Sequence, residues 1–459
     1  MPSARTFPAA RGAWLATTLS VLLAACGGGG GDPSSAPQIT QFSADRTQYF
    51  VGERARLAVQ YRGGSGRIEP GIGPVASGSA IETPALADGV NYRLIVESPQ
   101  GATSRSLSLD VAFRDRYVAL SAPWRSARHA AVLTGDGSVL LIGGSRAEST
   151  LSYGIDRFDP ATGTFTRIGQ MQVGRELHRA TRLADGRILV TGGGVTTLDA
   201  RSAELIDERT GASTRIADAI AGRIDHTATL LADGRVLLAG GATAGSGAMI
   251  SDTAEIWDPA TGQFRLVGAR MNTRRMSHTA TLLADGRVLL AGGFSSSASY
   301  APAEVFDPAT ERFTAASAPV ALQRGLHSAH RLADGSVLIV GGDQFDPATG
   351  MASILSTALR FDPATSTLAA APALASPRSA VSSLRLPDDR ILMFGGIASP
   401  TEHAASTEAY HPTRGSHPLA PLPAARAWHS VTRLADGRVL IVGGENSDGD
   451  LLSQALLYE

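Results

Sequence analysis

The 459-residue chain contains no lysine, so all of its basic side chains are arginines. A substrate Schiff base and an amine general base are therefore excluded. Aromatic residues make up only 5% of the chain, which argues against deep clefts lined by stacked rings. The single cysteine, Cys26, has no second cysteine with which to form a disulfide inside the chain.

Neither sign of charge is in excess, because 41 basic residues stand against 42 acidic ones. An even balance creates no positive field that would attract nucleic acid. The sequence also lacks a Walker loop, a Gly-x-Ser-x-Gly motif and a paired-cysteine motif. We therefore expect no nucleic-acid partner, no cofactor and no metal, and no residue stands out as catalytic.

The amino terminus has the pattern of an export signal. Arg5 and Arg11 precede an apolar run over residues 13–25 that is too short to span a bilayer as a mature helix. The run ends in Leu-Ala-Ala-Cys at residues 23–26, which resembles the lipobox of bacterial lipoproteins. This resemblance implies a signal peptide over residues 1–25 and lipidation of Cys26. Glycine rather than aspartate follows the cysteine, which in this family is compatible with transfer to the outer membrane.

Two further segments precede the main body of the chain. Residues 26–37 are rich in Gly, Ser and Pro and predict a flexible tether. Residues 38–114 contain short runs of alternating polarity, such as 56–61, 92–97 and 106–111, separated by turn-rich stretches. These runs predict a small β-sandwich. It resembles the immunoglobulin-like modules of bacterial surface proteins, and a spacer role is the simplest interpretation.

The remaining residues, 115–459, repeat one unit about every 50 residues. Each unit has two short apolar runs joined by a turn dipeptide such as Asp233-Gly234 and closed by a glycine pair. The pairs begin at Gly143, Gly192, Gly240, Gly292, Gly341, Gly395 and Gly443. A period near 50 with this glycine pair resembles a kelch array. The resemblance implies an all-β fold, a seven-bladed β-propeller with four strands per blade.

The two ends of this repeat region predict how the ring closes. The chain stops after residues 455–459, which match only a third strand. Residues 116–123 align with the outer strand of the fourth repeat, at residues 312–319. The amino-terminal strand should therefore complete the seventh blade and remove its free edge.

Loop lengths predict which face of the ring carries function. The Asp-Gly and Asp-Pro turns share one face and are short and uniform. The segments after each glycine pair lie on the other face and vary in length, and variable loops of repeat arrays usually bind ligands. The longest of these segments contains Asp343 and Asp346 and breaks the repeat, which makes both acids candidate binding residues.

The variable face also carries Arg-x-x-His at the start of most inner strands. The candidate binding residues are Arg175 with His178, Arg223 with His226, Arg275 with His278, Arg324 with His327 and Arg426 with His429. Two repeats keep one member each, His129 in the first and Arg378 in the sixth. A functional interpretation makes these residues a cationic collar for an anion. A structural interpretation, which we favour, has them satisfy carbonyl groups between blades, with the recurring glutamates in a similar role.

Two metal-dependent alternatives are weaker. Oxygen side chains at residues 445–450 surround a glycine, as in a calcium loop, but the distal glutamate is missing and a polar turn is favoured. The best-known enzymes with such propellers are copper radical oxidases similar to galactose oxidase, which need a cysteine cross-linked to tyrosine. The lone cysteine here lies in the lipobox, so this resemblance does not extend to copper oxidase activity.

These observations favour a lipid-anchored binding or interaction protein of the bacterial cell envelope. Its variable-loop face would take a protein or glycan ligand. The main alternative is a surface or periplasmic carbohydrate-active enzyme of lyase or mutarotase type. A third possibility is a purely structural envelope protein. An acid or base with a perturbed pKa beside an open cavity would distinguish an enzyme from a binder.

Overall fold

The computed structural model describes residues 36–122, 125–145, 150–194, 196–244, 249–296, 299–317, 322–346 and 351–459. The predicted signal peptide, Cys26 and most of the tether lie outside these ranges. The helices within them are all too short or too polar to cross a membrane. Contacts divide the chain into two compact units. The first consists of residues up to Asp45, Arg56–Glu82 and Asn91–Leu107, and the second of Arg46–Ala55, Thr83–Val90 and Ser108–Glu459.

The first unit is built from antiparallel strands, which is compatible with the predicted sandwich. One sheet has the order β1 (Gln38–Ala44), β3 (Arg56–Arg62), β6 (Ala80–Glu82). A second contains β8 (Gly101–Ala112), β7 (Val90–Ser98), β4 (Ser65–Glu69) and β5 (Gly73–Val75). Leu57 and Val59 of β3 are buried while Arg56 and Gln60 are exposed, the alternation of a sheet with one face in a core. In the second unit, β2 (Gln48–Phe50) pairs in parallel with the end of β8.

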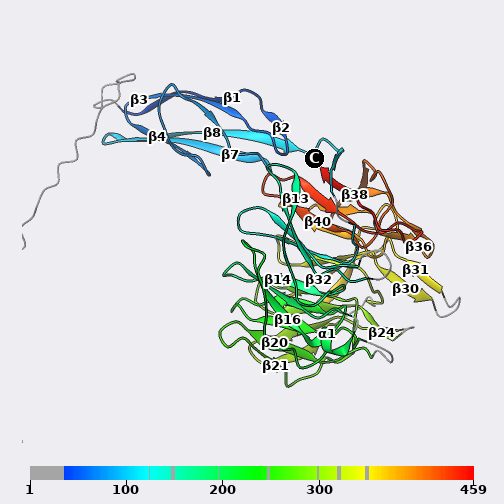
Figure 1. The fold of residues 1–459 in the computed structure, drawn as a ribbon. Helices are drawn as coiled ribbons and strands as arrows, with labels where there is room; N and C mark the ends of the chain where they lie inside the picture. The colour runs from blue at the N-terminus through cyan, green and yellow to red at the C-terminus, as the bar shows by residue number, and fades with distance from the viewer. Residues whose placement is uncertain are drawn as a thin grey trace, which may run out of the picture. The chain divides into compact units, whose positions relative to one another are not determined.

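The second unit contains seven four-stranded sheets, which we call blades one to seven in the order of their innermost strands (Figure 1). Blades one to three are β10 (Ala130–Leu133), β11 (Val139–Ile142), β12 (Gly154–Asp159), β13 (Thr164–Gln170); β14 (Arg179–Arg182), β15 (Arg187–Thr191), β16 (Ala203–Asp207), β17 (Ser213–Arg215); and β18 (Thr227–Leu230), β19 (Val236–Ala239), β20 (Ala254–Asp258), β21 (Gln263–Leu266). Blades four and five are β22 (Thr279–Leu282), β23 (Val288–Ala291), β26 (Glu304–Asp307), β27 (Arg312–Ala315); and β28 (Ser328–Arg331), β29 (Val337–Val340), β32 (Ala358–Asp362), β33 (Thr367–Ala371). Blades six and seven are β34 (Ser382–Arg385), β35 (Ile391–Phe394), β38 (Thr407–His411), β39 (Gly415–Leu419); and β40 (Ser430–Arg433), β41 (Val439–Val442), β42 (Ala455–Tyr458), β9 (Tyr117–Leu120).

The blades form a closed ring. Their innermost strands contact one another in the order β10, β14, β18, β22, β28, β34 and β40, and β40 contacts β10 again. The last blade is completed as predicted, because β9 pairs antiparallel with β42 from Tyr117↔Tyr458 to Leu120↔Ala455. Arg116 adds an ion pair to Glu459 beside this ladder. The strand at the start of the ring is thus joined to the strand at its end.

The hydrophobic core is divided among the interfaces between blades. Each of seven clusters of buried residues combines side chains from two adjacent blades. Between blades two and three, for example, Leu189 packs with Leu238 and Trp257. The second strand of every blade carries most of this packing, since its apolar side chains are buried on both faces. Such a core stabilises neighbouring blades only when they stack.

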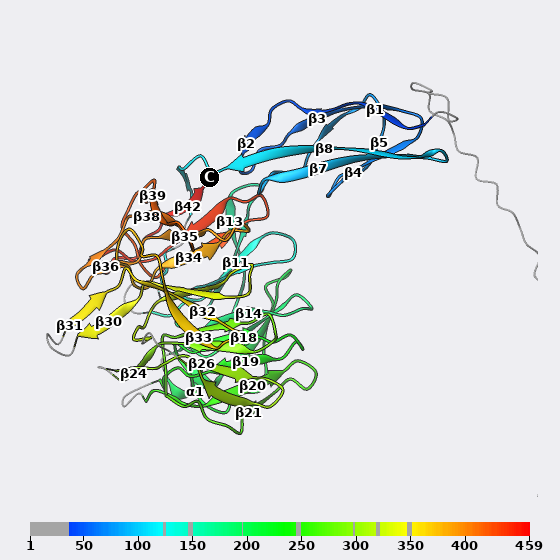
Figure 2. The same cartoon turned by 180° about the vertical axis from the view of Figure 1, so that it is seen from behind.

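Extra elements decorate the variable face. They are the short helix α1 (Thr197–Arg201) in blade two and three hairpins in blades four to six (Figure 2). The hairpins are β24 (Phe294–Ser296) with β25 (Ser299–Tyr300), β30 (Asp343–Asp346) with β31 (Met351–Ile354), and β36 (Ile397–Ser399) with β37 (Glu402–His403). We call these three hairpins the hairpin group, and within it the hairpins of blades five and six lie next to each other, because β31 contacts β36.

Candidate binding site at the mouth of the ring

The arginines of the Arg-x-x-His motif are buried inside their own blades. Arg223 is 1% exposed and pairs with the fully buried Glu255 at 2.9 Å. Its Nη1 donates to the carbonyls of Gly240 and Thr253 at 2.8 and 2.9 Å. Equivalent buried pairs join Arg175 to Glu204, Arg275 to Glu304 and Arg378 to Glu408. These guanidinium groups tie the second and third strands of one blade together.

Two of these arginines have no carboxylate partner within the described ranges. In blades five and seven the position of the glutamate is taken by Leu359 and Leu456. Arg324 instead donates to the carbonyls of Gly341 and Thr357, at 2.8 and 2.9 Å. Arg426 donates to the carbonyls of Gly443 and Gln454, both at 3.2 Å. Burial lowers the pKa of both arginines to about 10, so they remain charged near neutral pH.

We expected these side chains to satisfy carbonyl groups between blades. For the arginine side chains this prediction is wrong. The guanidinium groups stay within a blade, and the backbone carbonyl of the same arginine reaches the preceding blade. Gly241 donates its N–H to the carbonyl of Arg275 at 2.8 Å, and the second glycine of every pair does the same to the corresponding residue of the next blade. A Cβ at Gly240 would lie 2.4 Å from that carbonyl oxygen, which explains why glycine stands there.

Three histidines of the motif, His226, His278 and His327, link adjacent blades through hydroxyl groups. Nε2 of His278 shares a hydrogen bond with Thr227 at 3.0 Å, and Nε2 of His327 shares one with Thr279 at 2.9 Å. In these two bonds the hydroxyl belongs to the innermost strand of the preceding blade. Burial lowers the pKa of His327 to about 3 and that of His278 well below its usual value. These rings are neutral at physiological pH, so they add no positive charge to a collar.

The Arg-x-x-His motif also includes His178, His226 and His429. All three are buried, and burial lowers their pKa values, in the case of His178 to about 3. Nε2 of His226 shares a hydrogen bond with Thr191 at 2.9 Å. With neutral imidazoles and enclosed guanidinium groups, the motif presents no exposed ring of cations.

A different set of residues surrounds the mouth of the ring, and sequence reasoning missed it. One residue per blade, directly before the histidine position, has a positive φ between 47° and 59°. The seven are Arg128, Leu177, Asp225, Ser277, Leu326, Ala380 and Trp428. We call them the mouth ring. Each of these residues occupies the position just before that of the histidine in Arg-x-x-His. The variety of side chains at that position was the signal in the sequence that could have revealed them.

Backbone hydrogen bonds join the mouth ring from blade to blade. The N–H of Arg128 donates to the carbonyl of Trp428 at 3.0 Å, and the N–H of Asp225 donates to the carbonyl of Leu177 at 3.0 Å. Six such bonds run around the described part of the ring. Because the backbone supplies the links, the side chains at these positions can differ without loss of the ring.

The mouth ring encloses a cavity of about 290 Å³. On one side, Arg128 lies over the ring of Trp428 at 5.3 Å and pairs with Glu445 at 2.8 Å. On another, Asp225 accepts a hydrogen bond from Ser277 and pairs with Arg179 at 3.3 Å. The cavity thus offers an aromatic face, two partly exposed arginines and one carboxylate, alongside apolar positions such as Leu326.

Of the two acids predicted from the longest loop, Asp343 does not line this cavity. Asp343 begins β30 and exchanges backbone hydrogen bonds with Gly325. Its carboxyl group is buried, which raises its pKa to about 6. Asp346 ends the same strand, opposite Met351. The structure therefore places the predicted loop residues in the hairpin group rather than at the mouth.

No arrangement suited to a metal ion occurs in the ranges that the structure describes. No group of three histidine, cysteine or acidic side chains is close enough to hold an ion. The segment considered as a calcium loop is a turn in which Oδ1 of Asn446 accepts the N–H groups of Asp448 and Asp450. Hydroxyl groups of neighbouring strands share hydrogen bonds with the imidazoles of His129, His226, His278 and His327.

Comparison with known proteins agrees with this architecture. Residues 126–172 match the Kelch motif. A fungal alcohol oxidase of the AA5 family, solved in complex with copper, superimposes with a TM-score of 0.60 at 15% identity over 75% of each chain. The structure of YjhT has a TM-score of 0.49 at 13% identity, covering 62% of this chain and 95% of that one. No curated protein sequence matches significantly. At these identities the likeness is one of fold.

Proposed function

Because the chain is a kelch-repeat β-propeller, we propose that it is a binding protein whose ligand enters the mouth of the ring. The ligand would be a glycan or a segment of another protein. The mouth ring carries this proposal: one backbone geometry repeats seven times and bears Arg, Leu, Asp, Ser, Leu, Ala and Trp side chains. A rigid frame with dissimilar side chains pointing to one cavity suits recognition.

The chemistry of the cavity supports binding more than catalysis. General acids and bases work best with pKa values near the operating pH. The imidazoles beside the cavity have pKa values lowered by burial, to about 3 for His178 and His327. The acid with a pKa raised to about 6, Asp343, does not line the cavity. Trp428 beside Arg128 instead offers a flat apolar face and hydrogen-bond donors, which bind sugars and peptides alike.

Glycan and peptide arrays probed with the full chain test this proposal. Trp428→Ala should weaken binding by about thirtyfold or more, the effect of losing a central aromatic contact. Tyr153→Ala is the matched control, because Tyr153 is an exposed aromatic residue that does not line the cavity. Equal loss in both variants, or loss only in the control, would place the site elsewhere.

We further propose that the protein is exported and lipid-anchored through Cys26, with the amino-terminal module as a spacer in the bacterial envelope. The Leu-Ala-Ala-Cys motif at residues 23–26 supports this localisation. Cys26→Ala should move the protein from the membrane fraction to the soluble fraction, since each buried methylene of a lipid contributes about 0.8 kcal/mol. Wild-type protein that takes up no labelled fatty acid would contradict the proposal.

A further inference from the structure

Two blades differ from the other five at a pair of neighbouring positions. Five blades have arginine directly after the first hairpin turn and an apolar residue in the middle of the third strand. The arginines are Arg187, Arg235, Arg287, Arg390 and Arg438, and the apolar residues are Leu205, Ile256, Val305, Ala409 and Leu457. Blades one and five reverse this arrangement, with Ser138 and Ser336 after the turn and Arg157 and Arg360 in the third strand.

In blade one the relocated arginine holds a turn of the next blade. Arg157 pairs with Asp136 of its own hairpin at 3.5 Å. Its Nη2 also donates to two consecutive main-chain carbonyls, those of Glu208 and, at 3.0 Å, Arg209. These carbonyls belong to the turn between β16 and β17. This Asp-Ser-Arg arrangement is therefore a receptor for a tight turn of polypeptide.

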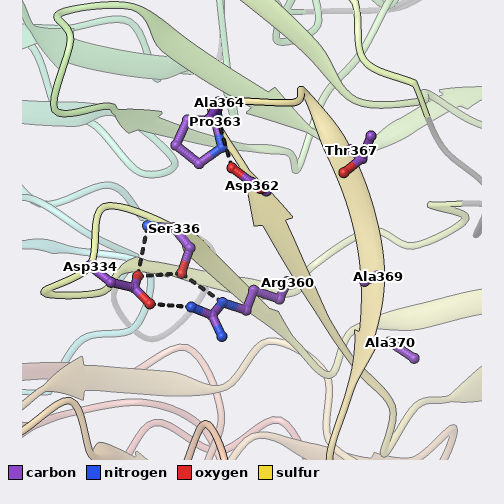
Figure 3. A pocket seen from close by; sticks show the side chains of 9 residues that line it. All are labelled: Asp334, Ser336, Arg360, Asp362, Pro363, Ala364, Thr367, Ala369 and Ala370. Carbon is purple, nitrogen blue, oxygen red and sulfur yellow. Dashed lines mark hydrogen bonds and ion pairs between the residues drawn. The ribbon is translucent and has the colours of Figure 1, made fainter.

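Blade five has the same three residue types at these positions, but its arginine makes different contacts. Nε of Arg360 donates to Ser336 at 2.8 Å, and its Nη2 pairs with Asp334 (Figure 3). Among the described residues Arg360 makes no hydrogen bond to the turn of blade six. Its side chain is 40% exposed, against 22% for Arg157. Nη2, which holds the turn in blade one, pairs here with Asp334, and Nη1 of Arg360 has no hydrogen-bond partner among the described residues.

A hollow of about 590 Å³ lies beside Arg360. Arg360 and Asp334 line one side, Asp362 and Pro363 another, and the outer strand β33 a third (Figure 3). On that strand Ala369 and Ala370 are exposed and small, so they leave room against the strand. The hollow lies on the face of the Asp-Gly and Asp-Pro turns, at the opposite end of the strands from the mouth.

The charged side chains around the hollow indicate which kind of ligand it can bind. Two carboxylates, on Asp334 and Asp362, accompany the single guanidinium of Arg360. An anion placed there would meet net negative charge, whereas neutral carbonyl oxygens accept from the guanidinium without this repulsion. We propose that this hollow is a second binding site, which takes the main-chain carbonyls of a tight turn on a partner protein. The site does not depend on the proposed function of the mouth.

The segment held by Arg157 supplies the probe for a test. A capped peptide Asp-Glu-Arg-Thr-Gly-Ala, the sequence of residues 207–212, is titrated into the full chain labelled at alanine methyl groups. The methyl signals of Ala364, Ala369 and Ala370 should shift and saturate at millimolar peptide. The variant Arg360→Leu has the residue found at this position in blades two and seven. It should raise the peptide concentration at the titration midpoint at least about tenfold, because the charged hydrogen bonds are lost.

Two controls make the outcome decisive. Arg187→Ala should leave the titration unchanged, because Arg187 pairs with Asp185 of its own turn but does not line this hollow. A scrambled peptide of the same composition should cause no saturable shift, since it lacks the turn. Equal shifts with the scrambled peptide, equal binding by Arg360→Leu, or no saturable shift in the wild type would each overturn the proposal.

Discussion

The arginines and histidines of the repeated Arg-x-x-His motif are buried, together with the glutamates that pair with the arginines. We call these residues the frame of the ring, because they stabilise it from within and contribute little to its surface. Arg223 and Glu255 form an ion pair that is almost wholly removed from solvent, and Thr227 bonds to His278 of the next blade. Sequence reasoning identified the motif because it recurs, and recurrence favoured a structural role. It could not foresee the partners, because which carbonyl or hydroxyl lies within reach depends on the packing of neighbouring blades.

The buried histidines make stability depend on pH. The folded pKa of His327 is about 3, below the unfolded value near 6.5, because burial disfavours its charged form. Above pH 6.5 both states are neutral, and as the pH falls toward 3 only the unfolded state gains the proton. Stability is therefore lost as the pH falls, by up to about 2 kcal/mol per such histidine between pH 7.5 and pH 5.

Urea denaturation at these two pH values checks the effect. The variant His327→Val has the residue that blade six carries at the same position, Val381, and should show a smaller loss of stability on acidification than the wild type. An exposed histidine replaced in the same way, His417→Val, should leave the loss unchanged. Equal pH dependence in the wild type and in His327→Val would contradict the buried, neutral state of this ring.

At the scale of elements, the repeat predicts the strands well. In blade three the two apolar runs on either side of Asp233-Gly234 form the strands Thr227–Leu230 and Val236–Ala239. Alternating polarity and Asp-Gly turns mark these elements locally. The mouth ring was missed because its left-handed residues, such as Trp428 and Leu177, carry no sequence mark of a positive φ.

Strand β9 offers a test at this scale. Deleting residues 116–123 leaves the seventh blade with three strands and exposes the edge of β42. We expect the variant to aggregate or to lose its single cooperative unfolding transition. Val118→Thr, which keeps the ladder to Leu457, serves as control and should unfold like the wild type. A deletion variant that melts as sharply, and at the same temperature, would contradict closure by β9.

At the scale of the whole molecule, the structure separates a buried frame from exposed recognition surfaces. Arginine–glutamate pairs join the strands within a blade, while histidines and paired glycines join neighbouring blades. The side chains of the mouth ring vary on this frame, as does the relocated Arg360 on the opposite face. The seven repeats could be predicted from the glycine pairs, the ring from the resemblance to kelch arrays, and its closure from the match of residues 116–123 to an outer strand. The mouth cavity could not, because it arises only when seven blades converge.

This separation is the central claim, and the free energy of unfolding tests it most directly. Arg223→Ala should lose about 3–5 kcal/mol, because Glu255 is left as an uncompensated buried charge. Arg128→Ala, at the partly exposed mouth, should lose no more than about 1 kcal/mol. Urea denaturation of the two variants beside the wild type gives both values. If Arg223→Ala were as stable as the wild type while Arg128→Ala unfolded readily, the assignment of frame and mouth would be contradicted.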